Sequence, residues 1–378
     1  MQLPEEFINQ TRTLLGDERF SRFMAALDEE PPVSVRLNPS RFSSPGSALS
    51  PLSSLLSPLP WCPLGFYLTS RPQFTFDPLF HAGCYYVQEA ASMFIDHVLR
   101  QYVRRPVEML DLCAAPGGKS TAALGALPQG SVLVSNEPVR QRCQVLRENI
   151  EKWGYPNCEV TNLYPADFRK NGRQFDVILC DVPCSGEGMF RKDPAAVGEW
   201  SLQNVEKCWR LQRDIVSEAW QCLRQGGLLI YSTCTFNTKE NEENLQWILQ
   251  TFEADILPLD TKPEWGITGS LLEGFDAPVY RFIPGLTRSE GLFMAVVRKA
   301  AEPRVELSYN QAIAYLRGEA LVLPADVPQG LVTLTFMGQA LGQAKNLGGR
   351  ANNLYPKPWR IKSTYIPKVY EAIFRPLE

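Results

Sequence analysis

Residues 107–120 read VEMLDLCAAPGGKS, and this stretch decides the fold class. The apolar run at residues 107–112 predicts a strand, and residues 119–127 predict a helix that follows a loop of small residues. Small residues at such a turn allow backbone N–H groups at a helix start to approach a ligand closely. The stretch therefore predicts the first strand and helix of an α/β domain, with a ligand-binding loop between them.

Strands and helices alternate from about residue 104 to residue 300. Further strands are predicted at residues 131–135, 175–180 and 227–232, and further helices at residues 140–153, 205–223 and 240–252. The continuous apolar run at residues 175–180 is typical of a strand buried in a parallel sheet. This alternation predicts a doubly wound, Rossmann-like sheet, whose ligands bind at the carboxyl ends of the strands.

Regions with different patterns flank this domain. Before it, the sequence predicts two amphipathic helices, at residues 5–15 and 18–27, and a strand at residues 33–38. A Ser/Pro-rich loop is predicted at residues 39–63, and a longer helix at residues 86–102. After it, the sequence predicts a helix at residues 309–317 and a strand at residues 330–336, followed by a turn at Met337 and Gly338. We therefore expect a small N-terminal α+β domain at residues 1–103 and a central α/β domain at residues 104–300. A small β-rich domain is expected at residues 303–378.

The composition is that of an ordinary globular protein. Hydrophobic residues make up 44% of the chain, and the net charge is −3, so binding to a nucleic acid would need a local basic patch. No apolar run reaches the ~18 residues that a membrane span needs, and no secretory signal is visible. We therefore expect the ten cysteines to be reduced thiols in the cytoplasm. We expect no metal, because the sequence has no C-x-x-C pair and no histidine motif.

Two kinds of ligand loop fit residues 113–120. A P-loop, G-x-x-x-x-G-K-[ST], matches the last three residues, but Cys113 stands where its first glycine is required and Pro116 removes a backbone donor. The alternative is the S-adenosylmethionine loop of a Rossmann-like methyltransferase, which requires an acid about 20 residues further on to bind ribose hydroxyls. Glu137 stands there, after the strand at residues 131–135, and Asp167, in Pro165-Ala166-Asp167-Phe168, stands where a polar contact to adenine is expected. The sequence favours the methyltransferase.

Two cysteines stand at the ends of two neighbouring strands. The strand predicted at residues 175–180 leads into Asp181-Val182-Pro183-Cys184-Ser185-Gly186, and the strand predicted at residues 227–232 leads into Ser232-Thr233-Cys234-Thr235. Neighbouring strand ends converge on one cleft, so we expect Cys184, Cys234 and Asp181 to face the same ligand. The cysteines in apolar surroundings are interpreted as small buried hydrophobes: Cys113, Cys143, Cys158, Cys180, Cys208 and Cys222. The loop-like settings of Cys62 and Cys84 leave both interpretations open.

Thiols in such a cleft fit methylation of a pyrimidine ring. Carbon 5 of cytosine is a poor nucleophile, but a thiolate that adds to carbon 6 converts the ring into an enamine, and carbon 5 can then attack an activated methyl group. A base removes the proton from carbon 5, and the thiol is eliminated. An acid near N3 and N4 stabilises the charge that develops on the ring, and Asp181 is the candidate for this role.

The motifs together resemble the Sun/RsmF-type RNA cytosine-5 methyltransferases. The resemblance rests on Asp111-Leu112-Cys113-Ala114-Ala115-Pro116-Gly117-Gly118-Lys119 and on the two cysteine motifs, and it covers about residues 30–300. Val35-Arg36-Leu37-Asn38 and Tyr86-Val87-Gln88-Glu89-Ala90 are similar to the N-terminal signatures of the family. The resemblance implies an S-adenosylmethionine-dependent RNA methyltransferase with a Rossmann-like catalytic domain.

The resemblance also implies residue roles. Cys234 is then the nucleophile, and Cys184 assists in proton removal or product release. DNA cytosine methyltransferases use the thiol of a Pro-Cys motif instead, so only the family match decides this assignment. The implied cofactor contacts are Cys113, Ala114, Ala115, Pro116, Gly117, Gly118, Lys119, Glu137, Asp167 and Asp181. Lys119 is expected to line the catalytic site as well.

Although the net charge of the chain is −3, its C-terminal tail contains a local basic patch. Residues 344–369 contain no acid, and aromatic residues lie between the basic ones. Basic groups neutralise phosphates and aromatic rings stack on unpaired bases, so this stretch predicts RNA binding. The candidate RNA-binding residues are Lys345, Arg350, Tyr355, Lys357, Trp359, Arg360 and Lys362, with Tyr365 and Lys368 in the same stretch. Arg191 and Lys192, next to a cysteine motif, are further candidates for contacts with the target strand.

Residues 347–356 resemble the PUA-like C-terminal domain of RsmF-type enzymes, which modify small-subunit ribosomal RNA. This resemblance implies 16S rRNA, or the small ribosomal subunit, as the partner of a monomeric enzyme, with RNA-binding regions at residues 1–103 and 303–378. Transfer RNA is an alternative substrate. An inactive RNA-binding module is a rival of another class, but it would need neither the two thiols nor the complete cofactor loop.

Overall fold

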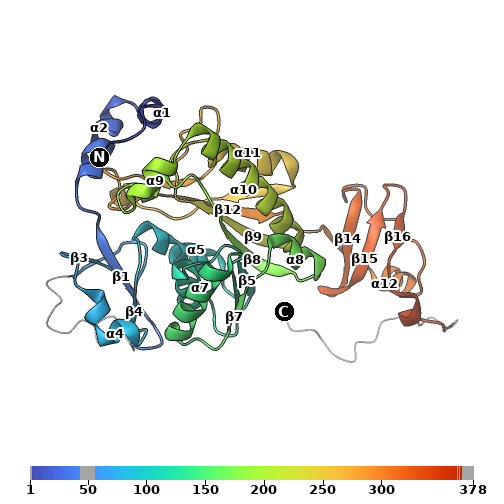
Figure 1. Cartoon of the computed structure of the whole chain (residues 1–378). Helices are drawn as coiled ribbons and strands as arrows, with labels where there is room; N and C mark the ends of the chain where they lie inside the picture. Colours follow the sequence, from blue (N-terminus) through green and yellow to red (C-terminus); the bar gives the residue numbers. More distant parts are fainter. Residues whose placement is uncertain (1, 43–55, 364, 366, 368–378) are drawn as a thin grey trace. The chain divides into compact units, whose positions relative to one another are not determined.

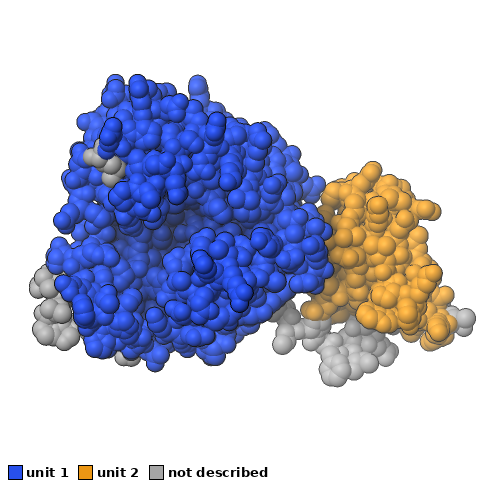
Figure 2. Space-filling view, in the orientation of Figure 1, with its two compact units in different colours: residues 1–300 blue, residues 301–378 orange. Residues whose placement is uncertain are grey.

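The computed structural model describes residues 2–42, 56–363, 365 and 367. The chain forms two compact units, residues 1–300 and residues 301–378 (Figure 2). No helix of the described residues is long and apolar enough to cross a membrane.

The larger unit begins with two helices and a small sheet. The helices are α1 (Glu5–Leu15) and α2 (Asp17–Asp28), as expected from the apolar spacing. The sheet has the order β2-β3-β1-β4, with every neighbouring pair antiparallel. Its strands are β1 (Val33–Leu37), β2 (Leu56–Pro58), β3 (Gly65–Leu68) and β4 (Tyr85–Val87), and the short helices η2 (Phe74–Phe76) and α4 (Pro78–His81) connect β3 to β4.

Two expectations for this region are wrong. The stretch predicted as loop contains β2, which pairs with β3; residues 43–55 of it lie outside the described residues. The helix predicted at residues 86–102 begins later, as α5 (Phe94–Tyr102), after the turn η3 (Ala91–Met93). Tyr86 and Val87 are held in β4 by pairing with β1, and Glu89 accepts the N–H groups of Ala91 and Ser92, so the helical turns start only after Glu89.

The doubly wound sheet is confirmed. Its strands have the order β10-β12-β9-β8-β5-β6-β7, and β11 (Tyr280–Phe282) pairs with β12 (Figure 1). Five neighbouring strands are parallel: β5 (Glu108–Asp111), β6 (Val132–Asn136), β7 (Cys158–Thr161), β8 (Phe175–Asp181) and β9 (Leu223–Thr233). The strand β12 (Leu292–Lys299) is antiparallel to β9 and to β10 (Ala254–Leu257).

Helices cover both faces of this sheet. The helices α5, α6 (Gly118–Ala126) and α7 (Arg140–Trp153) pack on one face, which includes Met109 and Leu133. The helices α8 (Pro165–Lys170), α10 (Leu202–Cys222) and α11 (Glu242–Thr251) pack on the other, which includes Leu110 and Val134. Consecutive residues of β5 and β6 thus enter opposite cores, which explains why these strands are apolar without alternation.

A third apolar cluster joins the first two helices to the loops beyond β8 and β9. Phe7 of α1 lies 5.0 Å from Phe190, and Phe23 of α2 lies 5.2 Å from Phe236, between ring centroids. Trp200, just after the short helix α9 (Pro194–Glu199), belongs to the same cluster. The N-terminal helices therefore pack against the segments that follow the two cysteine motifs.

The smaller unit is a four-stranded sheet with one helix on it. The order is β13-β14-β15-β16, formed by β13 (Arg304–Glu306), β14 (Gly330–Phe336), β15 (Gln339–Asn346) and β16 (Ala351–Asn353). The helix α12 (Tyr309–Leu316) buries Tyr315 in the core, and the turn η6 (Lys357–Trp359) follows the last strand. Met337 and Gly338, both at positive φ, make the predicted turn between β14 and β15.

Candidate active site

The carboxyl ends of β8 and β9 bring the two motif cysteines together. Asp181, the last residue of β8, pairs with Ser232 of β9. Cys184 and Cys234 follow within three residues of the ends of these two strands. The Sγ atoms of Cys184 and Cys234 lie 3.3 Å apart, and both thiols are half-buried and free. One thiol therefore donates a hydrogen bond to the other sulfur.

The surroundings favour Cys184 as the protonated partner. Its hydrogen bond to Cys234 and its burial raise the pKa of the Cys184 thiol well above the usual value. A thiol that keeps its proton can donate to the sulfur of Cys234 and thereby stabilise a thiolate there.

Lys119 and Asp181 form an ion pair beside the cysteines. The Nζ of Lys119 lies 2.8 Å from Oδ2 of Asp181, and the lysine side chain is only 13% exposed. Burial lowers the pKa of Lys119, but the charge and the hydrogen bond of Asp181 raise it by more, with a further contribution from Cys234. The ammonium group is therefore positively charged next to the thiol pair.

The loop between β5 and α6 has the conformation that its small residues predicted. Gly117 adopts φ 112°, a left-handed conformation that favours glycine, and α6 begins directly after it. Ala114 donates its N–H to the carbonyl oxygen of Asn136, which ties this loop to the end of β6. Beneath the loop, burial raises the pKa of Asp111 to about 7, opposed by a 2.6 Å hydrogen bond from the hydroxyl of Ser120.

Glu137 follows β6 and is almost completely buried. Its Oε1 accepts the N–H of Val139, whereas its Oε2 has no hydrogen-bond partner among the described residues; the nearest charged group is Arg142, 3.5 Å away. A buried carboxylate oxygen without a donor is unfavourable in the free protein. This oxygen is available to accept hydrogen bonds from a ligand.

Asp167 lies in the first turn of α8. Its Oδ2 accepts the backbone N–H of Tyr164 at 3.0 Å, and its Oδ1 lies 3.5 Å from Nζ of Lys170. This arrangement caps the helix N-terminus and is sufficient to explain an acid at this position. The expected contact between Asp167 and adenine stays a prediction.

A buried carboxylate that the sequence analysis missed connects the two cysteine loops. The Oε2 of Glu240 accepts the N–H of Ser185 at 3.0 Å and a hydrogen bond from Gln212 at 2.6 Å. Its Oε1 accepts hydrogen bonds from the hydroxyl of Ser185 at 2.5 Å and from Asn237 at 2.9 Å. Burial raises the pKa of Glu240 to about 7, although these hydrogen bonds oppose the shift. Because Ser185 directly follows Cys184, Glu240 fixes the position of that cysteine.

Glu187 makes a second buried connection between the same loops. Its Oε2 accepts the N–H groups of Phe236 and Asn237, at 2.5 and 3.1 Å, and its Oε1 accepts the indole N–H of Trp200 at 3.0 Å. The next residue, Gly188, donates its N–H to the carbonyl oxygen of Cys234 at 2.7 Å. For Glu240, the signal in the sequence was the high density of Asn and Glu residues at residues 237–244, directly after the Thr-Cys-Thr motif.

The two N-terminal signature motifs brace the same site. Arg36 of β1 is buried and donates hydrogen bonds to Oε1 of Gln88 and to the carbonyl oxygens of Gly118 and Thr121, in the first turn of α6. Glu89 accepts the N–H of Glu290 at 3.0 Å, in the loop that leads into β12. The small N-terminal sheet thus contacts both the ligand loop and a segment beside the cysteines.

Arg191 does not have the role that its sequence position suggested. Its side chain is 6% exposed, and it forms a bidentate ion pair with Glu290, which is 3% exposed. It also donates hydrogen bonds to the carbonyl oxygens of Ala26 and Ser289. These partners take up the Nε and both Nη groups, so Arg191 connects segments of the fold, and the expected direct contact with RNA is wrong.

The basic residues of the smaller unit divide into exposed and packed ones. Exposed side chains are those of Lys345, Arg350, Lys357, Trp359 and Lys362, together with Tyr365. Tyr355 instead packs between Tyr315 and Trp359, and Arg360 lies against Gly318 with its Nε enclosed. Packing is therefore sufficient to explain Tyr355 and Arg360. Lys368 lies outside the described residues.

All ten cysteines are free. Cys143, Cys180, Cys208 and Cys222 are buried as interpreted, while Cys113 and Cys158 are half-buried. Of the two left open, Cys62 is buried, which raises its pKa to about 12, and Cys84 is half-buried. Among the described residues, no group of three or more His, Cys, Asp or Glu side chains could hold a metal ion.

Comparison with known proteins identifies the family. Residues 103–298, more than half of the chain, match the family described as 16S rRNA methyltransferase RsmB/F. The chain belongs to this RsmB/F family. Residues 3–90 match the N-terminal domain of 16S rRNA methyltransferase RsmF, and residues 302–361 match the RsmF PUA domain. The Rossmann-like methyltransferase fold with an N-terminal α+β domain and a C-terminal PUA-like domain is thereby confirmed, and the P-loop interpretation is excluded.

Individual relatives agree with the family. Ribosomal RNA small subunit methyltransferase F of Pectobacterium atrosepticum is 34% identical over 312 residues, which cover 79% of this chain and 63% of that protein. The chain thus spans less than two thirds of the length of such curated relatives. A methyltransferase homologue from Pyrococcus horikoshii is 26% identical with a TM-score of 0.65, covering 79% of this chain and 100% of that one. NSun6 from Pyrococcus horikoshii, solved with SFG, is similar in fold, with 20% identity, a TM-score of 0.68, and coverage of 79% and 99%.

Proposed function

We propose that this RsmB/F-family protein transfers a methyl group from S-adenosylmethionine to carbon 5 of a cytosine in RNA, with 16S rRNA or the small ribosomal subunit as substrate. The observation that carries the proposal is the pair of free thiols 3.3 Å apart, next to the Lys119–Asp181 ion pair, at the carboxyl ends of two parallel strands. This is the place where doubly wound sheets bind their ligands.

The residues present fit the cofactor. The Oε2 of Glu137, which accepts no hydrogen bond among the described residues, is a candidate acceptor for ribose hydroxyls. The loop Cys113-Ala114-Ala115-Pro116-Gly117-Gly118-Lys119 leads into α6, where no side chain caps the first backbone N–H groups. Asp181 and Asp167 complete the proposed contacts. The bound cofactor would supply the activated methyl group.

Cys234 is the proposed nucleophile. As a thiolate stabilised by the Cys184 thiol and by the charge of Lys119, its sulfur forms a bond to carbon 6 of the cytosine, and the ring electrons move to carbon 5. Asp181, held by Lys119, interacts with the N3–N4 edge of the ring, where charge develops.

Cys184 is proposed to act after the methyl group is in place. A basic group must remove the proton from carbon 5, so that the bond between carbon 6 and the Cys234 sulfur breaks and the thiolate leaves. Cys184 is the proposed group that serves this step, because its sulfur is adjacent to that of Cys234. Its thiol gives its proton to the departing Cys234 sulfur, and the Cys184 thiolate so formed accepts the proton from carbon 5, directly or through a water molecule.

The domain roles are part of the proposal. Residues 104–300 would carry catalysis, while residues 1–103 and the PUA-like residues 303–378 would hold the RNA. In the latter, the exposed Lys345, Arg350, Lys357, Trp359 and Lys362 are the better candidates, and the partly packed Tyr355 and Arg360 are the weaker ones. The proposed enzyme is a monomer.

A covalent trap tests the mechanism. The variants Cys184→Ala and Cys234→Ala are incubated separately with cofactor and 16S rRNA, then separated on denaturing gels. We expect Cys184→Ala to accumulate a protein–RNA adduct and Cys234→Ala to form none. The reverse pattern would exchange the two roles. No adduct with either variant, and no methylation of rRNA by the wild type, would refute rRNA as the substrate and direct the same test to transfer RNA.

A further inference from the structure

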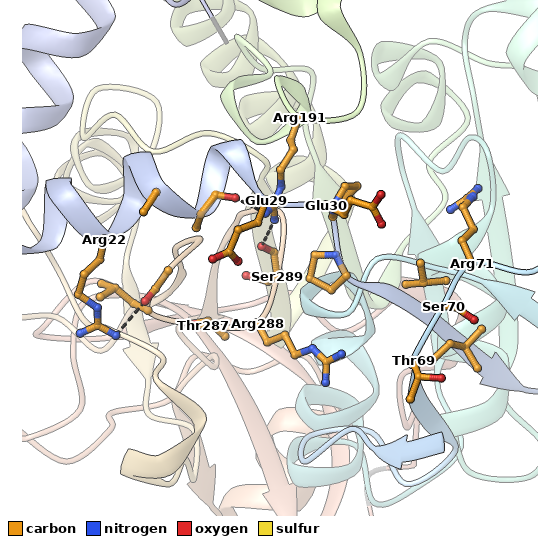
Figure 3. Close-up of a pocket in the computed structure, with 18 residues that line it drawn as sticks. Arg22, Glu29, Glu30, Thr69, Ser70, Arg71, Arg191, Thr287, Arg288 and Ser289 are labelled. Carbon is orange, nitrogen blue, oxygen red and sulfur yellow. Dashed lines mark hydrogen bonds between the residues drawn. The ribbon is translucent and has the colours of Figure 1, made fainter. Parts of the chain in front are cut away.

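A groove with exposed arginines lies beside the proposed active site and has no role in the chemistry described so far. It is formed by the end of α2, the segment that leads into β1, the residues after β3, and the loop at residues 285–289, and its volume is about 640 Å³. Figure 3 shows Arg22, Arg71 and Arg288 arranged around Glu29 and Glu30. We call it the arginine groove.

The three arginines have free donors. Among the described residues, none of Arg22, Arg71 and Arg288 forms an ion pair, and all three are exposed. Arg22 uses one donor on the carbonyl oxygen of Gly285. The other two lie over aromatic rings: Arg288 is 4.3 Å from the ring centroid of Tyr67, and Arg71 is 5.6 Å from that of Phe74. Stacking orders these guanidinium groups while leaving their N–H donors available.

Hydroxyl groups line the groove as well. The Oγ of Ser289 is buried and has no hydrogen-bond partner among the described residues. Thr69 and Ser70 are exposed in the same wall. Arginine forks and hydroxyls are among the side chains that contact phosphate oxygens of nucleic acids. The combination fits a phosphodiester backbone.

The loop that forms one wall of the groove runs on towards the cysteines. Arg288 and Ser289 belong to a loop whose next residues, Glu290 and Gly291, have carbonyl oxygens 3.2 Å from where a Cβ on Gly188 would lie. Gly188 itself binds the carbonyl oxygen of Cys234. At ~3.5 Å of chain per residue, the groove edge lies within about 10 Å of that contact. This separation is short enough for the groove to contact the strand within a nucleotide or two of the target.

We propose that the arginine groove binds the phosphate backbone of the RNA strand next to the target cytosine, which deepens the proposed function and rests on it. Arg191 has a defined part here: by binding Glu290 and the carbonyl oxygen of Ser289, it holds the loop that presents Arg288. Glu29 and Glu30 lower the positive charge of the groove and would weaken the attraction for phosphate.

The test compares two variants with the same change in charge. In Arg71→Ala/Arg288→Ala the groove loses two cations. In the control, Arg104→Ala/Arg105→Ala, two exposed cations are lost just before β5. They lie at the amino-terminal end of this strand, whereas the cysteines follow the carboxyl ends of β8 and β9. The affinity for a 16S rRNA transcript is measured at several salt concentrations, together with methyl transfer and cofactor binding.

We expect the groove variant to bind RNA more weakly, with a salt slope reduced by up to about 1.4, since each phosphate contact to a single strand contributes about 0.7. The control should keep the wild-type slope, and both should bind cofactor normally. Arg71→Lys/Arg288→Lys should recover most of the slope, and Glu30→Gln should strengthen binding.

Other outcomes would overturn the inference. An unchanged slope in the groove variant, or an equal loss in the control, would remove the groove from the RNA interface while methylation by the wild type leaves the proposed function intact. Weaker binding to the assembled subunit alone, with normal binding to the free transcript, would assign the groove to a protein partner. If the wild type methylates no RNA, the proposed function fails, and the salt slopes still report on the groove.

Discussion

Replacing Glu240 with glutamine tests how the two cysteine loops are held together. Both carboxylate oxygens of Glu240 accept hydrogen bonds, from the N–H and hydroxyl of Ser185 and from the amides of Gln212 and Asn237. A glutamine keeps one acceptor and places an NH₂ group where the second stood, so one donor faces another. An unmet buried donor costs about 1–3 kcal/mol, and this cost does not depend on pH.

The wild type has a dependence on pH that the variant lacks. Burial raises the pKa of Glu240 from 4.5 to about 7 in the folded protein. As the pH rises, the unfolded chain therefore releases this proton first, and the free energy of unfolding of the wild type falls by about 1.4 kcal/mol per pH unit between these values, or about 3 kcal/mol in all. The stability of Glu240→Gln should not change in this way, so the difference between the two proteins should move in favour of the variant by about 3 kcal/mol from pH 5 to pH 8.

Urea unfolding followed by tryptophan fluorescence measures this difference. All tryptophans except Trp359 lie in residues 1–300, so the signal reports on the larger unit. Methyl transfer should fall about a hundredfold in the variant, because small displacements of catalytic groups have effects of that size, while cofactor affinity stays unchanged.

Parallel stability curves for the two proteins from pH 5 to 8 would refute this reasoning. They would mean that the four donors keep Glu240 ionised in the folded protein as readily as in the unfolded chain. Normal methyl transfer by the variant would show that the position of Cys184 does not depend on Glu240.

Further perturbations test other contacts of the site. Glu137→Gln should weaken cofactor binding about tenfold or more in calorimetry and leave RNA affinity unchanged, because a buried charged acceptor is lost. Gly188→Ala places a Cβ 2.8 Å from the carbonyl oxygen of Cys234, so methyl transfer should fall in a radiolabel assay while cofactor still binds. Arg191→Met leaves Glu290 buried without its partner and should lower the free energy of unfolding by about 3–5 kcal/mol in urea titrations.

Each of these has a matched control. Arg191→Met/Glu290→Gln removes both charges and should regain most of the lost stability; equal instability of the single and double variants would contradict a buried-charge effect. Gly198→Ala, at a glycine with open space around it, should leave methyl transfer unchanged. Val139→Ala, on an exposed side chain beside Glu137, should bind cofactor as the wild type does.

The central fold was predictable because it is encoded by local patterns. Apolar runs and glycine loops gave the strands β5, β6, β8 and β9 and the helices between them, with α7 correct at both ends. The helix expected at residues 86–102 was wrong because pairing with β1 is a long-range interaction that outweighs local helical preference. The strand β2 was missed for the same reason.

The sequence predicted the chemical groups of the candidate site, but not the hydrogen bonds and ion pairs that hold them in place. The sequence placed Cys184, Cys234 and Asp181 at strand ends that parallel topology brings together, as the 3.3 Å contact of the thiols bears out. It did not reveal Glu240, because nothing in one sequence shows which of several neighbouring acids points inward. Arg191 was misassigned because a basic residue after a catalytic motif has the same sequence signal whether it is exposed or paired.

What the sequence alone determined about this protein is the doubly wound sheet, its ligand loop and the two cysteine motifs, since short-range periodicity and turn chemistry specify them. The tertiary structure decided that the two thiols are in contact, which carboxylates are buried between the loops, and which arginines are free. These properties depend on burial and on partners that can be hundreds of residues away in the sequence, as with Glu89 and Glu290. The physical reason is that hydrogen bonds and electrostatic interactions depend on the distance between groups in space, not on their separation along the chain.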